Sequence, residues 1–466
     1  MASVSSDSRV EVLPFPTRRT YFGLAILCMA FAVYGSLLPF DLKHVPLEIA
    51  WDQFRATMFG SPIRRLSRTD VLANVLLFVP VGFALAGSML VDRTARLVMV
   101  PATLVTFAVS IPLSVAVEFL QLFTSDRVPS RTDILAQTVG CALGIAVWSL
   151  TGRGLTKWLR ETLAAAPENR LLRLLTGFVA AWLFVSLAPF DITVDLGDLA
   201  DRAHSGQINV IPFAGFDISE PRQLWDALAE TLAAIPLGLL GFVRVRGRPG
   251  RSRASAFALG GMLVVCVELT QVFIESHAAD ATDLVFGWAG TAVGVEIPRR
   301  LRSDLLQASP NAAGSVVWRG LALLAICVVV LCAYHWLPYD FGLNGELIRR
   351  KLDRMSLLPF AGYRAGSDLN ALNDLLLKLA LSIPFGVATA YALRGTGLAR
   401  RVVNAIALVL AVGVFATIEA AQLFLPTRIP DPTDVLTGTV GTLIGLTLAR
   451  WLQAGDLPHT RARPPR

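Results

Sequence analysis

Long apolar runs separated by short polar segments dominate the chain. Charged residues are absent from Phe22 to Leu38, Val71 to Leu90, Leu97 to Val117 and Ile134 to Leu150. A helix needs about 20 residues to cross a hydrocarbon core about 30 Å thick, and each of these runs is close to that length. The pattern predicts an all-α, polytopic membrane helix bundle. The twelve expected spans are residues 20–40, 71–91, 97–123, 132–151, 171–190, 225–243, 254–275, 282–298, 317–338, 372–393, 401–425 and 433–452.

Composition supports a membrane protein. Of the 466 residues, 54% are hydrophobic and 17% are charged, with a mean hydropathy of +0.57. A soluble domain needs more polar surface than this. The first span is too long and too poor in small-residue cleavage signals for a signal peptide, so we interpret it as an uncleaved helix.

The distribution of basic residues predicts the orientation in the plasma membrane. A net charge of +7 is compatible with nucleic-acid binding, but twelve spans with a cytoplasmic N-terminus place 26 Lys and Arg inside and 15 outside. This asymmetry follows the positive-inside rule, so we expect both termini in the cytoplasm and no nucleic-acid partner. The outer loops 41–70 and 344–371 depart from the rule, because each carries five basic residues.

One ordered set of motifs occurs three times. It comprises Pro-aromatic-Asp, then Asp with Pro-x-Gly ten residues later, Glu-x-x-Gln-x-Phe, and Thr-Asp followed by GxxxG. Its Asp, Glu, Gln and Thr-Asp positions are Asp70, Glu118, Gln121 and Asp133, then Asp226, Glu268, Gln271 and Asp283, then Asp374, Glu419, Gln422 and Asp434. An even number of spans gives each copy the same orientation, unlike the inverted repeats of many transporters. We therefore predict three parallel four-span repeats at 20–152, 171–298 and 317–452.

The motif set resembles the VanZ-like family, a small bacterial membrane domain of about four spans. The resemblance covers nearly the whole chain and implies a cell-envelope role without a settled activity. Resistance to glycopeptides such as teicoplanin and the handling of an outer-leaflet lipid or lipid-linked precursor are the two roles that it suggests. An Asn of the pattern is kept as Asn74 in repeat 1 but replaced by Glu230 and Lys378 in repeats 2 and 3. The loop Arg is kept as Arg127 and Arg428, whereas repeat 2 has His277. Repeat 1 is therefore the most complete copy.

The shared polar residues are expected to gather near the outer end of each repeat. Glu118 lies about 9 Å from the outer end of its helix at 1.5 Å per residue, and Asp133 begins the return helix, where Thr132 can help to cap it. The predicted catalytic acid and base are Glu118 and Asp133. The predicted substrate-binding residues are Gln121, Arg127, Asn74, Asp70, Glu268, Gln271, Asp283, Glu419, Gln422, Arg428 and Asp434.

Several interpretations of these residues remain open. The pocket can bind a lipid headgroup or a lipid-linked precursor, with Arg127 on a phosphate. Alternatively, the Glu, Gln and Asp side chains lock the third span of each repeat to the fourth, as in a non-catalytic scaffold. A transporter or channel is a third possibility, although such a path needs polar residues deeper in the membrane. Membrane lipids are the expected partners in each case.

Other chemistry lacks sequence support. The GxxxG pairs are expected to let helices approach closely. Lys378 and Glu230 can form an intramembrane ion pair between repeats, or Lys378 can extend toward the interface. The five Cys show no CxxC pairing and the five His are not clustered along the sequence. We therefore expect no cofactor and no metal.

Overall fold

The computed structural model describes residues 15–38, 40–60, 68–93, 96–125, 129–188, 191–246, 252–306, 312–361, 368–394 and 396–453. Its fold is almost entirely helical, as predicted. The chain forms two compact units. Unit 1 comprises Met1–Ala164 with Ser356–Leu376, and unit 2 comprises Ala165–Met355 with Leu377–Arg466.

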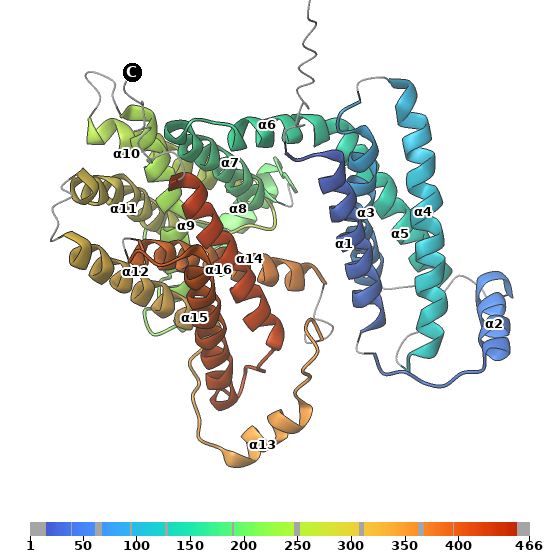
Figure 1. Ribbon diagram of the computed structural model, residues 1–466. Helices are drawn as coiled ribbons and strands as arrows, with labels where there is room; N and C mark the ends of the chain where they lie inside the picture. The colour runs from blue at the N-terminus through green and yellow to red at the C-terminus, as the bar shows by residue number, and fades with distance from the viewer. Residues whose placement is uncertain are drawn as a thin grey trace, which may run out of the picture. The chain divides into compact units, whose positions relative to one another are not determined.

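Unit 1 contains repeat 1. Its helices are α1 (Arg18–Leu37), α2 (Leu47–Arg55), α3 (Arg68–Leu90), α4 (Met99–Leu120), α5 (Arg131–Val147) and α6 (Arg153–Leu163). The four long helices α1, α3, α4 and α5 run side by side (Figure 1). The short helix α2 continues as a π-helical turn, Ala56–Gly60, and packs against the end of α4. Phe54 and Met58 are buried there against Leu122.

Unit 2 contains repeats 2 and 3. Repeat 2 has α7 (Pro167–Leu187), α8 (Leu196–His204), α9 (Pro221–Val245), α10 (Arg253–Gln271) and α11 (Ala281–Leu306), and a short parallel pair of strands, β1 (Ile208–Asn209) and β2 (Ala279–Asp280). Repeat 3 has α12 (Ala312–His335), α13 (Gly345–Arg354), α14 (Asp368–Ala392), α15 (Arg400–Ala421) and α16 (Pro432–Gln453). The two repeats touch through the rings of Trp225 and Tyr334, whose centroids are 4.9 Å apart.

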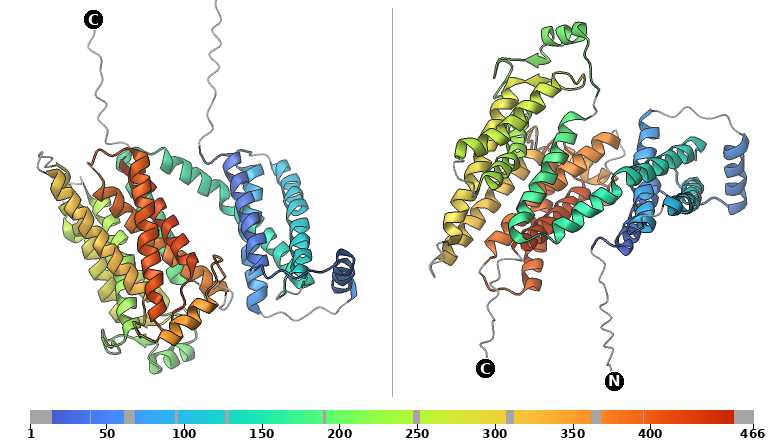
Figure 2. Two further views of the ribbon diagram at one scale, coloured as in Figure 1. Left: turned by 60° about the horizontal axis from the view of Figure 1, so that its bottom comes forward. Right: turned by 90° about the horizontal axis from the view of Figure 1, so that it is seen from above.

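A short helix between the first two long helices is common to all three repeats. These helices are α2, α8 and α13, and the twelve-span interpretation of the sequence did not include them. The green segment α8 extends beyond the ends of the long helices of repeat 2 (Figure 2). Similarly, α13 lies beyond the ends of α15 and α16 (Figure 1). Each repeat therefore has an additional short helix at the end where its first long helix stops.

Close packing of the second long helix on the fourth depends on glycine, as the GxxxG motifs predict. A Cβ atom on Gly82 of α3 would collide with the backbone carbonyl of Cys141, and one on Gly144 of α5 would collide with that of Val79. Equivalent glycines in the other repeats are Gly238 and Gly294, and Gly386 and Gly445. Pro80, Pro236 and Pro384 lie inside unbroken helices, each two residues before the glycine of its Pro-x-Gly motif.

Eleven of the described helices are long and apolar enough to cross a membrane. The twelfth expected span, 282–298, lies in α11 and is not one of the eleven, because Asp283 and Glu296 make it less apolar. It nevertheless packs against α9 and α10, the place that α5 takes against α3 and α4 in repeat 1. Exposed Leu, Val and Phe side chains cover the outer faces of the long helices, as expected for contact with lipid.

Candidate functional site

The glutamate of the Glu-x-x-Gln motif fixes the start of the fourth long helix. In repeat 1, Glu118 Oε2 accepts the backbone N–H of Ser130 at 2.8 Å, and the glutamate is fully buried. The equivalent bonds join Glu268 to the N–H of Asp280 and Glu419 Oε2 to the N–H of Asp431, the latter at 2.9 Å. A buried carboxylate therefore accepts a backbone hydrogen bond in all three repeats. This supports the interpretation that these side chains lock the third span of each repeat to the fourth.

The residue that receives this bond is also the helix cap. The Ser130 side chain accepts the N–H of Thr132 at 3.1 Å and caps α5. In the other repeats, Asp280 caps through the N–H of Thr282 at 2.7 Å, and Asp431 caps through that of Thr433 at 2.8 Å. The expectation that Asp133 and Thr132 share the capping of this helix was wrong, because the cap is Ser130. Asp133 lies inside the first turn, where its negative charge interacts favourably with the positive end of the helix dipole.

The motif glutamine ties the third long helix to the first in two repeats. Gln121 Nε2 donates to the carbonyl of Ser36 at 3.1 Å, and Gln271 Nε2 donates to that of Ser186 at 2.9 Å. Repeat 3 differs, because Gln422 Nε2 donates instead to Glu419 Oε1 at 2.9 Å. Ser36 and Ser186 lie three residues before the proline of the Pro-aromatic-Asp motif. Repeat 3 has His335 at this position.

The variable position of the second long helix has a different partner in each repeat. Asn74 Oδ1 accepts Gln137 Nε2 at 3.0 Å in repeat 1. In repeat 2, Glu230 lies close enough to Glu268 and Asp283 for the three carboxylates to repel one another.

In repeat 3, Lys378 Nζ lies 2.7 Å from both carboxylate oxygens of Asp434. The ion pair between Lys378 and Glu230, one of the two alternatives for Lys378, is not found in the described part of the chain. Lys378 of α14 pairs instead with Asp434 of α16 in its own repeat.

Repeat 3 thus gathers four ionisable side chains that are almost completely buried. His335 Nδ1 lies 3.5 Å from Glu419 Oε1 and 3.6 Å from Asp434 Oδ2. The side chains of His335, Glu419 and Asp434 are 2%, 8% and 5% exposed, and that of Lys378 is 11% exposed. Sequence reasoning missed His335, because its neighbours are 84 and 99 residues away. Comparing the three repeats position by position reveals it, since the other two have serine there.

The short helices of repeats 2 and 3 each contribute one buried basic side chain, which binds backbone carbonyls of the loop between the third and fourth long helices. Lys351 of α13 is buried and donates to the carbonyls of Gln422 at 3.1 Å, Arg428 at 2.6 Å and Leu425. Arg202 of α8 is buried too and donates to the carbonyls of Val272 at 2.7 Å and His277. Arg202 and Lys351 both lie 13 residues after the proline of the Pro-aromatic-Asp motif. In repeat 1 the short helix α2 is held by ring contacts instead, because Trp51 and Phe54 pack against Phe119 of α4.

The aspartate of the Pro-aromatic-Asp motif and the loop arginine bind the same loops. Asp340 accepts the N–H of Thr427 at 3.2 Å and its hydroxyl at 3.0 Å, and Asp191 binds Ser276 in the same way. Arg428 Nε donates to the carbonyl of Leu337 at 2.6 Å. Two predicted substrate contacts, Arg127 and the side chain of Asp70, lie outside the described residues. The structure therefore brings most predicted residues to one end of each repeat.

Comparison with known proteins agrees with the repeat analysis. The sequence model of the VanZ/LLP1 family matches residues 21–152, 175–302 and 321–453. Searches of curated proteins and of solved structures found no match. Because the three matches cover most of the chain, this membrane protein belongs to the VanZ/LLP1 family and carries three tandem copies of its domain.

Proposed function

We propose that the protein works in the cell envelope by binding the phosphate-bearing headgroup of an outer-leaflet lipid or lipid-linked precursor. The observation that carries this proposal is the basic helix α13. Its Arg349 and Arg350 are exposed at the end of repeat 3, on the predicted outer side, where the positive-inside rule disfavours basic residues. Arg350 lies 3.5 Å from the carboxylate of Glu346, but an exposed pair of this kind contributes little, so both arginines remain available to an anionic headgroup.

The surroundings of α13 suit a membrane surface. Leu343 and Leu352 are 91% and 51% exposed beside the arginines, an amphipathic pattern that favours the interface between headgroups and acyl chains. Lys351 fixes the same helix to the loop behind Glu419 and Gln422. A headgroup held by α13 therefore lies next to the end of the bundle that contains the buried polar cluster.

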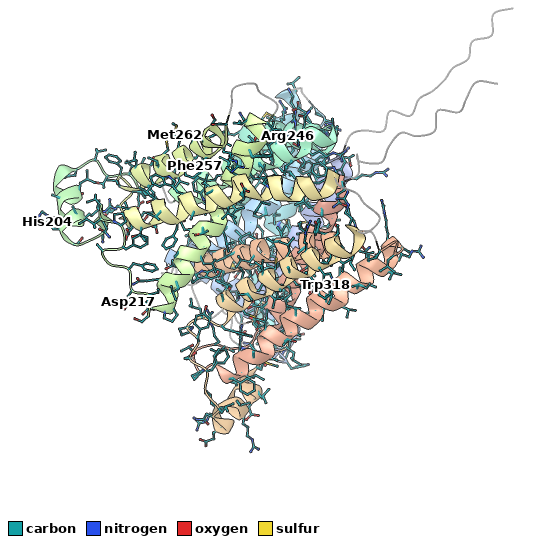
Figure 3. The ribbon with its side chains drawn as sticks, turned by 90° about the vertical axis from the view of Figure 1, so that its left-hand side faces the viewer. His204, Asp217, Arg246, Phe257, Met262 and Trp318 are labelled. Carbon is teal, nitrogen blue, oxygen red and sulfur yellow. The ribbon has the colours of Figure 1, made fainter. Side chains whose placement is uncertain are left out.

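The opposite end of unit 2 offers the matched control. Arg244 and Arg246 are exposed at the end of α9. Arg246 lies at the far end of repeat 2 from His204 and Asp217 (Figure 3). We place this arginine-rich end in the cytoplasm and the end that carries α8 and α13 on the outer face.

The test combines a gene deletion with these two pairs of arginines. Loss of the gene is expected to change the pool of lipid-linked precursors, measured by mass spectrometry, or the sensitivity to teicoplanin. The wild-type gene and Arg244→Gln/Arg246→Gln should restore the parental state, whereas Arg349→Gln/Arg350→Gln should not. No change in either readout on deletion refutes the proposal, and so does full complementation by the α13 variant.

A binding experiment distinguishes the two sources of the headgroup. Native mass spectrometry of the purified protein with phosphatidylglycerol or with a polyprenyl phosphate reports which lipid is retained. The α13 variant is expected to retain less of the preferred lipid than the α9 variant does. Equal retention by the two variants would show that the arginines of α13 do not form the binding surface.

A further inference from the structure

The donor atoms of His335, Glu419 and Asp434 are spaced like ligands around a metal ion. Nδ1 of His335 lies 3.5 Å and 3.6 Å from one oxygen of each carboxylate, and the three donor atoms lie within 4.8 Å of one another. Ligands about 2.0–2.2 Å from a tetrahedral zinc ion are separated by about 3.4 Å. Hydrogen bonds from N–H to oxygen are shorter, about 2.7–3.2 Å. The observed separations fit shared coordination better than direct hydrogen bonding.

Burial of the histidine adds to this geometry. The side chain of His335 is 2% exposed, and its Nε2 atom has no hydrogen-bond partner among the described residues. Its Nδ1 atom makes only the two long contacts with the carboxylates. A buried polar group without a hydrogen bond is costly, and a cation held between Nδ1 and the two carboxylates would give Nδ1 a partner.

We propose that His335, Glu419 and Asp434 bind one divalent transition-metal ion, with zinc as the expected occupant. Imidazole nitrogen and carboxylate oxygen are ordinary zinc ligands, and three protein ligands leave a fourth position open, as in catalytic zinc sites. Lys378 donates a hydrogen bond to Asp434, and Gln422 donates one to Glu419. Hydrogen bonds of this kind commonly orient the ligands of a metal ion. This replaces the expectation from sequence that the chain has no metal site.

The position of the site allows a metal to reach it. His335 is the last residue of α12, Glu419 is two residues from the end of α15, and Asp434 lies in the first turn of α16. All three ligands are therefore near helix ends, where an ion from the aqueous side has the shortest path. Repeats 1 and 2 have serine in place of His335, so the ligand set is complete in repeat 3 alone and the expected stoichiometry is one ion per chain.

Metal analysis of the full chain tests the site. The protein is purified through a tag without histidine, incubated with zinc, desalted and analysed by mass spectrometry for bound metal. Wild type is expected to keep one zinc ion per chain, and Co²⁺ in its place should give the intense visible absorption of a four-coordinate site. His335→Ser, which installs the residue of the other repeats, is expected to weaken binding by more than about 100-fold, because changes behind the ligands alone cost about 10–100-fold.

Control variants make the result decisive. His204→Ser removes an exposed histidine of α8 and should leave the zinc content unchanged. Glu419→Gln, which is nearly isosteric, should lose zinc and supplies the comparison if His335→Ser does not fold. Wild type that holds no more zinc than either ligand variant refutes the site. Loss of zinc in His204→Ser also refutes it, by locating the ion elsewhere. Lipid binding by α13 is measured without zinc, so the two proposals fail separately.

Discussion

Replacing Lys378 with Met removes the cation that neutralises Asp434 inside unit 2. The ammonium lies 2.7 Å from each carboxylate oxygen, and the two side chains are 11% and 5% exposed. Removing one partner of a buried ion pair costs about 3–5 kcal/mol, mainly because the remaining charge is left unpaired in a medium of low polarity. An exposed pair contributes only about 0–1 kcal/mol. Lys378→Met is therefore expected to lower the free energy of unfolding by about 3–5 kcal/mol.

The second variant, Lys378→Met/Asp434→Asn, tests the origin of this loss. The double variant removes the carboxylate of Asp434 that Lys378→Met leaves without its cation, so it is expected to be more stable than Lys378→Met alone. Unfolding in detergent, followed by tryptophan fluorescence with EDTA present, gives the free energies without a contribution from bound metal. A loss below about 1 kcal/mol for the single variant would show that the pair is solvated in the membrane protein.

A charge exchange identifies the partner of Lys378. Lys378→Glu places a carboxylate beside Asp434 and should be strongly destabilising. Glu230 lies with Glu268 and Asp283 of its own repeat, so Glu230→Lys is expected to change the free energy of unfolding by the same amount in wild type and in Lys378→Glu. A clearly larger gain in Lys378→Glu than in wild type would refute the assignment of Lys378 to Asp434.

Three further predictions address the scaffold. Gly144→Ala should cost about 1–3 kcal/mol or more, because its Cβ would meet the carbonyl of Val79. Gly23→Ala in α1, with open space around it, should not lower the thermal unfolding temperature, because alanine favours a helix more than glycine does. Lys351→Met should increase proteolysis of the 425–431 loop, because three carbonyls lose their donor, and an unchanged cleavage pattern would show that the loop does not depend on α13. Glu118→Gln keeps an acceptor for the N–H of Ser130 and should fold normally; unchanged activity in the complementation assay would exclude the predicted acid–base role of Glu118 with Asp133.

Features that repeat along the sequence were predictable from it. Apolar runs of membrane-spanning length report helices directly, because a helix in lipid satisfies its own backbone hydrogen bonds. Recurrence of GxxxG also predicted that helices approach closely, and Gly82 and Gly144 show that the second and fourth long helices are the ones that do so. The weakest prediction was span 282–298, where Asp283 and Glu296 reduce the hydrophobicity of α11.

Features that depend on contacts between distant segments were not predictable from spacing. His335 belongs with Glu419 and Asp434 only because α12, α15 and α16 meet at one end of the bundle. The cap at Ser130 was predictable in principle, since serine or aspartate precedes Thr-Asp by two residues in all three repeats. Lys351 was harder to identify, because an exposed basic helix gives no sign that one of its cations turns inward.

The separation of fixed and variable positions explains how one scaffold holds three different sites. The bond from each motif glutamate to the cap of the fourth long helix uses backbone N–H groups, so it is independent of the side chains around it. The position of Asn74, Glu230 and Lys378 lies beside that bond without taking part in it. It can therefore be neutral, acidic or basic while the helices keep their places.

Motif completeness favours repeat 1 as the active copy, whereas the histidine at position 335 gives repeat 3 a set of ligands that the other two repeats lack. A buried charge in a membrane is maintained at an energetic cost, which is a physical reason to look for function there first.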